Sequence, residues 1–211
     1  LPVAILLVVV GLPSRRALAA PSGSDCLIAS ADVPEIHKGL LKGYLPDNAV
    51  PDSLQLLPPP PQLGQPEHAL DDTVSRRSFP LPGTPRWNLA AADADLGFPQ
   101  AASTFSCAIG APISEEATPT LVMLLRRTLT DAGLSTYKAK NHYGRKRPVL
   151  VNGKPICTPE DQAKLTTDPS YPSGHTAVGW AWALILSELV PQRRNAILAR
   201  GRADGARRPL C

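Results

Sequence analysis

The sequence is poor in the residues from which metal sites are built. Four histidines and four cysteines occur in 211 residues, and aromatic residues make up 5%. His37, His68, His142 and His175 are scattered along the chain, and no two cysteines have the paired spacing of a zinc site. We therefore expect no metal site, and the function predicted below needs no cofactor.

A strong charge of either sign is also lacking. The chain has 22 basic and 18 acidic side chains, which gives a formal net charge of +4. Neither a long basic run nor the pattern of a nucleic-acid-binding fold accompanies this mild excess. We therefore expect no nucleic-acid partner, and small acidic ligands are favoured instead.

No apolar run is long enough to span a bilayer. Residues 1–12 are almost wholly apolar, and the small residues of 17–20 resemble those that precede a signal-peptidase cut, although Arg15 and Arg16 interrupt the pattern. We predict a signal peptide over residues 1–20. The protein is then exported, periplasmic or secreted, without stable insertion in a membrane.

Prolines dominate the first half of the chain. There are 24 in all, and Pro58–Pro61 form a continuous run that disfavours helix. We predict an irregular, extended segment over residues 21–66. It is either a strap on the surface of its own domain or a ligand for a partner domain, and we favour the strap.

Residues 67–211 contain the helical patterns. Thr118 and Pro119 make a good helix start, and Arg126 and Arg127 are interpreted as solvated charges on the helix that follows. Residues 177–190 are apolar nearly all round, which is typical of a buried central helix. Further helices are predicted at 69–77, 88–96 and 192–202, the last with Ala196, Ile197 and Ala199 on its inner side.

A polar turn, Ser170–Thr176, leads directly into the apolar helix. The first N–H groups of a helix lack internal partners and attract anions. An equally simple interpretation is a helix capped by Ser173, with His175 at the surface. Upstream, Lys140 and Arg147 would share one helix face if residues 140–146 were helical, and both could then reach a common anion. The plainer interpretation there is a solvent-facing basic run.

Two motifs stand in order, K-x6-R-P from Lys140 to Pro148 and P-S-G-H from Pro172 to His175. Together they resemble the bacterial class A non-specific acid phosphatases, in the superfamily of type-2 phosphatidic acid phosphatases and vanadium haloperoxidases. Residues 83–87, 103–107 and 179–181 also match. The resemblance implies an all-α fold, a helical bundle of the acid phosphatase and haloperoxidase type.

The resemblance also implies roles for the motif residues. Lys140 and Arg147 would bind the non-bridging phosphate oxygens, and Ser173 and the N–H of Gly174 would donate to the same group. His175 would be the general acid that protonates the leaving alcohol. Cationic side chains would then do the work that a metal ion does in other phosphatases.

The chain departs from the family in its third motif, S-R-x5-H-x3-D, whose histidine is the nucleophile. Arg208 matches the phosphate-binding arginine of that motif, Arg207 replaces its serine, and the sequence ends at Cys211 before the histidine. We therefore expect a helical domain that is incomplete at its C-terminus. Cys157 and Cys211 correspond to two family cysteines near the active site and are candidates for a disulfide, with two free thiols as the alternative. Cys107 lies in an apolar stretch and is either buried or bridged.

The predicted function is an acid phosphatase that hydrolyses small phosphomonoesters through a phosphohistidine, with the nucleophile missing from residues 1–211. An inactive phosphate-binding remnant is the first alternative. A lipid phosphatase or a vanadate-dependent haloperoxidase is the second. Assembly into a homo-oligomer is left open.

Overall fold

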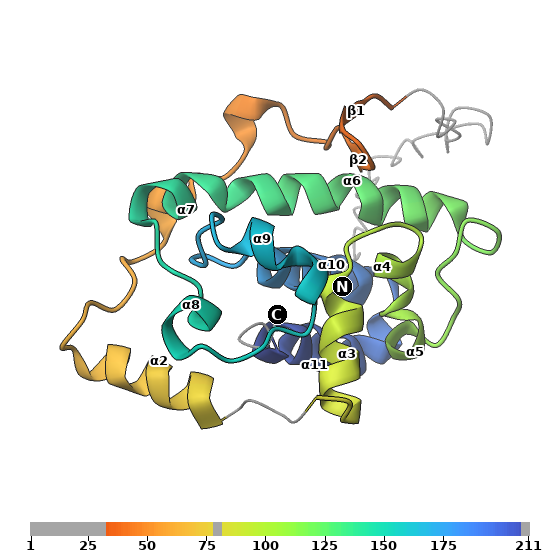
Figure 1. Cartoon of the computed structure of the whole chain (residues 1–211). Coiled ribbons are helices and arrows are strands. Elements are labelled where there is room, and N and C mark those ends of the chain that lie inside the picture. The colour runs from red at the N-terminus through yellow and green to blue at the C-terminus, as the bar shows by residue number, and fades with distance from the viewer. Residues whose placement is uncertain (1–32, 78–81, 208–211) are drawn as a thin grey trace, which may run out of the picture. The chain divides into compact units, whose positions relative to one another are not determined.

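The computed structural model describes residues 33–77 and 82–207 (Figure 1). The predicted signal peptide, Arg208 and Cys211 lie outside this part of the chain. The elements are β1 (Glu35–His37), β2 (Leu40–Leu41), η2 (Asp47–Ala49), α1 (Ser53–Leu56), α2 (Pro66–Arg77), α3 (Pro85–Ala94), α4 (Gln100–Ser103), α5 (Ser106–Ile109), α6 (Pro119–Ser135), α7 (Tyr137–Tyr143), α8 (Pro148–Asn152), η3 (Pro159–Asp161), α9 (Gln162–Leu165), α10 (Gly174–Leu189), η4 (Pro191–Arg193) and α11 (Arg194–Arg207).

The described chain confirms the all-α class, with one small antiparallel hairpin formed by β1 and β2. Helix α10 is packed between α6 and α11, which are its main neighbours. The indole of Trp182 on α10 lies edge-on to Phe98 and Phe105, and its Nε1 donates to the carbonyl of Leu125 on α6 at 3.0 Å. The apolar sequence of α10 thus makes it the central helix, as predicted. In the described residues, no helix has both the length and the apolar character needed to cross a bilayer.

The start of α6 also agrees with the sequence. Thr118 is the N-cap and Pro119 is the first helical residue, but the Thr118 hydroxyl does not bond within the new helix. It accepts instead from the backbone N–H of Ser114 at 3.2 Å, which fixes the preceding turn. The helix runs past Gly133 to Ser135.

The prediction that Arg126 and Arg127 are simply solvated was wrong. Arg127 donates to the carbonyls of Lys42 and Gly43, and its guanidinium lies 3.8 Å from the ring centroid of Tyr44. Arg126 pairs with Glu35 at 3.8 Å. Both arginines therefore hold the N-terminal segment against α6, because its backbone carbonyls and acidic side chain offer partners that the sequence pattern did not reveal.

The prediction of which residues form the inner side of α11 was also partly wrong. Ile197 is buried as predicted, whereas Ala196 and Ala199 are exposed. Gly201 and Asp204 are also buried, at the spacing of one helix face. A Cβ added to Gly201 would lie 2.5 Å from the Cβ of Ala183, so glycine permits the close approach of α10 and α11.

Substitution of two leucines on α10 should affect the free energy of unfolding to different extents. Leu186 is fully buried and Leu189 is 56% exposed. Leu186→Ala should lower the free energy of unfolding by about 2–5 kcal/mol, because it leaves a cavity between packed helices. Leu189→Ala, the matched control, should change it by less than about 0.5 kcal/mol. Urea unfolding followed by circular dichroism measures both; equal effects would contradict this packing.

Candidate functional site

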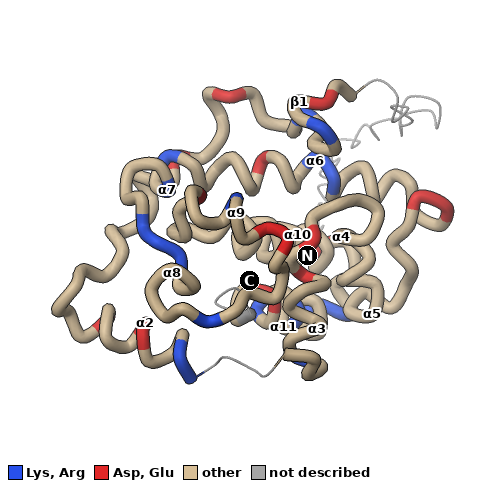
Figure 2. Tube along the Cα trace, viewed as in Figure 1, with Lys and Arg blue, Asp and Glu red and all other residues tan. Residues whose placement is uncertain are grey.

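The site forms where two segments that are distant in sequence cross. The segment Arg145–Arg147 joins α7 to α8, and Asp168–Tyr171 precedes α10. The backbone N–H of Ser170 donates to the carbonyl of Arg145 at 2.8 Å, and its hydroxyl lies within 3.1 Å of the carbonyls of Arg145 and Lys146. These bonds hold the basic segment beside the P-S-G-H loop. Figure 2 marks the basic residues in blue along the connection from α7 to α8.

Lys140 and Arg147 meet in a different way from the one predicted. Helix α7 ends at Tyr143 and is followed by its C-cap Gly144, which has a left-handed φ of 55°, and Pro148 begins α8 instead of ending α7. The two cations therefore do not share a helix face. They converge because Gly144 turns the chain and Ser170 holds the turn in place.

Lys140 is buried, with 6% of its side chain exposed. Its Nζ donates to the carbonyl of Pro169 at 2.8 Å and lies 3.5 Å from Oδ2 of Asp168. Burial lowers the pKa of Lys140 below its ordinary value of 10.5, and the charge of Arg147 lowers it too, whereas Asp168 opposes both.

Arg147 lies at the N-cap of α8, where Pro148 supplies the first helical residue. Its Nε donates to the backbone carbonyl of Asp168 at 2.8 Å, and its Nη2 forms an ion pair with the carboxylate of the same residue. The guanidinium is mostly buried, and its planar fork keeps further donors for an anion.

Asp168 is the site residue that sequence reasoning missed. It is the residue in contact with both Lys140 and Arg147, and it lies just before the Ser170–Thr176 turn. A carboxylate next to a predicted anion site was the available signal, but the sequence could not show which way it pointed.

Ser173 and Gly174 lie at the N-terminus of α10. The hydroxyl of Ser173 accepts from the N–H of Thr176 at 3.2 Å, as an N-cap does. Gly174 is the first helical residue, so its N–H has no partner within the helix pattern. The structure thus confirms the helix cap by Ser173, whereas His175 is half-buried and does not lie at the surface.

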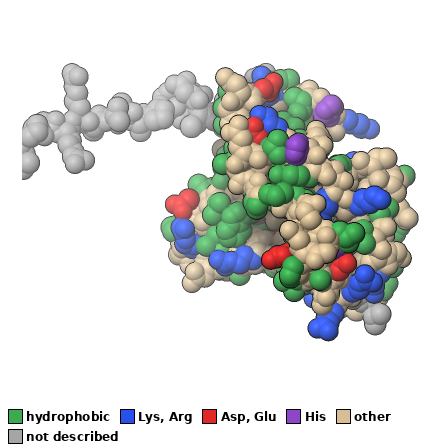
Figure 3. Space-filling model, turned by 90° about the vertical axis from the view of Figure 1, so that its left-hand side faces the viewer, with side chains coloured by type: hydrophobic (Ala, Val, Ile, Leu, Met, Phe, Trp, Pro, Cys, Tyr) green, Lys and Arg blue, Asp and Glu red, His purple; other side chains and the backbone are tan. Residues whose placement is uncertain are grey.

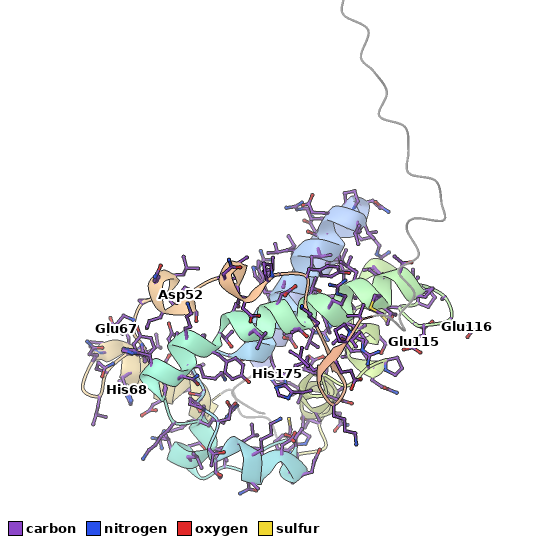
Figure 4. The ribbon with its side chains drawn as sticks, turned by 90° about the horizontal axis from the view of Figure 1, so that it is seen from above. Asp52, Glu67, His68, Glu115, Glu116 and His175 are labelled. Carbon is purple, nitrogen blue, oxygen red and sulfur yellow. The ribbon has the colours of Figure 1, made fainter. Side chains whose placement is uncertain are left out.

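His175 is tied to the end of α3. Its Nε2 lies 3.0 Å from the carbonyl oxygen of Ala94, and because a carbonyl can only accept, Nε2 carries a proton. The neighbouring Asp93 is buried and forms an ion pair with Arg200 of α11. In this way α11 holds the end of α3, and α3 orients the imidazole. Figure 4 shows His175 among the helices and His68 on α2.

A cavity of about 510 Å³ opens beside these groups. Figure 3 views the molecule from the side of α2, α7 and α8, where its surface is hollowed. Arg147, Ser173 and His175 line the cavity, and α2 provides the opposite wall with residues that include His68, Asp71 and Val74. Asp71 pairs with Arg145 across this space at 2.8 Å. The cavity has room for a small molecule next to the histidine.

The pH dependence of stability tests the burial of Lys140. Because its pKa is lowered on folding, the unfolded chain binds more protons between the lowered value and 10.5. The free energy of unfolding of the wild type should therefore rise, relative to that of Lys140→Gln, as the pH approaches 10.5 from below. Chemical denaturation of both proteins across this range measures the difference. A flat or falling difference would contradict a lowered pKa.

Comparison with known proteins shows the family to which the chain belongs. Residues 118–203 match the PAP2 superfamily. The chain is 44% identical to the non-specific acid phosphatase of Providencia stuartii over 169 residues, which are 80% of this chain and 68% of that protein. It is 41% identical to the acid phosphatase of Zymomonas mobilis over 76% of this chain and 61% of that protein, and 38% identical to the non-specific acid phosphatase of Salmonella typhimurium over 80% of this chain and 67% of that protein. The chain belongs to the class A non-specific acid phosphatases of the PAP2 superfamily.

Proposed function

We propose that the chain is an acid phosphatase whose phosphate site is formed by Lys140, Arg147 and the N-terminus of α10. The observation that carries this proposal is the convergence of the two cations on the loop that leads to His175. Phosphate oxygens would accept from Arg147, from the hydroxyl of Ser173 and from the N–H of Gly174. Arg208 would add a further donor by family resemblance.

The proposed reaction proceeds through a phosphohistidine. A histidine nitrogen attacks phosphorus, the bond to the leaving oxygen breaks, and His175 gives that oxygen a proton. Water then attacks phosphorus, the bond to the nucleophilic histidine breaks, and a proton of the water returns to His175 as inorganic phosphate is released. The nucleophile belongs to the S-R-x5-H-x3-D motif, which does not occur in residues 1–211. In this proposal, residues 1–211 hold the binding half of the site.

The cavity fits small substrates. It adjoins His175, where the alcohol of a phosphomonoester would leave, and its volume suits a substrate of modest size. A phosphomonoester is therefore the proposed partner, and we propose no nucleic-acid ligand. Export to the periplasm or the medium is proposed from the pattern of residues 1–20, which lie outside the described structure.

Turnover of a chromogenic phosphomonoester tests the function. At about pH 5–6, where imidazole is largely protonated, a chain extended through the third motif should be active. Residues 1–211 alone should be slower by several orders of magnitude, because a nucleophile is absent. Equal rates would contradict the proposed absence of the nucleophile. An inactive extended chain that still binds phosphate would favour the binding remnant.

The role of His175 is tested in the same extended chain. His175→Ala should lower the rate by about 10²–10⁴ with poor leaving groups, and by much less with good ones that need no proton. His37→Ala is the control, since His37 is exposed in β1 and is not among the residues that line the cavity, so the rate should be almost unchanged. A loss that is equal for all leaving groups would argue against proton donation by His175.

We also propose a disulfide between Cys157 and Cys211. Cys157 is buried in the loop between α8 and η3, whereas Cys107, predicted to be buried or bridged, is exposed and free. Peptide mapping without reductant should find the peptides of Cys157 and Cys211 linked, while Cys107 is alkylated. Alkylation of Cys157 in the unreduced protein would rule out the bridge.

A further inference from the structure

We infer that the carboxylate of Asp168 is an internal counter-ion that occupies the phosphate-binding donors of Lys140 and Arg147 and competes with phosphate for them. This inference rests on the proposed phosphate site. It adds a residue that sets the affinity of that site, which neither motif contains.

The contacts of Asp168 separate into two kinds. Its carboxylate pairs with Arg147 and lies 3.5 Å from Nζ of Lys140. The backbone makes the other contacts, since the carbonyl of Asp168 accepts from Nε of Arg147 and the carbonyl of Pro169 accepts from Nζ of Lys140, both at 2.8 Å.

The backbone contacts are sufficient to position the cations. Any residue at 168 would offer the same carbonyl to Arg147, and the carbonyl of Pro169 does not depend on the side chain before it. What only the Asp168 side chain supplies is a negative charge. That charge lies on the groups that would neutralise phosphate, so it weakens their attraction for a second anion.

The exposed fractions of the three side chains indicate that Asp168 is the one free to move. The carboxylate side chain of Asp168 is 30% exposed, against 17% for Arg147 and 6% for Lys140. The carboxylate can therefore turn toward water while the cations stay anchored to the backbone carbonyls. Arg147 lines the cavity, whereas the Nζ of Lys140 faces the loop of Asp168 and Pro169. Departure of the carboxylate would free a donor on each cation for phosphate.

Calorimetric titration with inorganic phosphate tests the inference. Residues 1–211 are compared as the wild type, Asp168→Asn and Asp168→Ala at pH 7 and low ionic strength. Loss of a unit charge a few ångströms from the bound anion should tighten binding by about tenfold or more in both variants. The gain should shrink as salt is added. Glu160→Gln is the matched control, because it removes the same charge from an exposed position in η3, before α9, and should change affinity by less than about twofold.

The possible results distinguish a failure of the counter-ion inference from a failure of the proposed phosphate site. Phosphate binding by the wild type with no gain in either Asp168 variant overturns the counter-ion and leaves the phosphate site standing. Weaker binding in both variants also overturns it, because the carboxylate would then be positioning the cations. If neither the wild type nor the variants bind phosphate, the proposed site and the inference both fail.

Discussion

The crossing of Arg145–Arg147 with Asp168–Tyr171 is the constraint on which the site depends. The side chains of Ser170, Lys140 and Arg147 donate to backbone carbonyls of these two segments, so each segment holds the other in place. Without these bonds, a short basic connection between two helices would be held only by its ends, and its like charges would separate. The crossing therefore holds both cations against the loop that precedes α10.

The packing of the helices in the rest of the described fold stabilises this crossing. Helix α10 begins at the loop and continues into the core, where Trp182 bonds to α6 and small residues bring α11 close. Helix α11 in turn holds α3 through the ion pair of Arg200 with Asp93, and the next residue of α3 accepts from His175. The proline-rich segment also reaches the site, since the carbonyl of Pro58 accepts from the hydroxyl of Tyr171 at 2.8 Å. That contact agrees with a strap on the domain's own surface.

Sequence reasoning predicted what depends on local chemistry. The apolar run of α10, its Ser173 cap and the start of α6 at Pro119 follow from periodicity and capping, which are properties of neighbouring residues. Long-range contacts were not predictable in this way. The end of α7 before Gly144, the partners of Arg127 and the position of Asp168 all depend on where distant backbone carbonyls lie. The sequence singled out Lys140 and Arg147, and the structure shows that both contact Asp168, but the reason for their convergence could not be read from the sequence.

Backbone and arginine NMR of residues 1–211 during a titration with inorganic phosphate tests the central claim most directly. If the crossing assembles one phosphate site, the largest shifts will come from the amides of Gly174 and His175 and from Nε–H of Arg147, and they will saturate together. Separate saturation of Arg147 and the α10 amides, or shifts confined to other basic residues, would contradict a single site formed by the two segments.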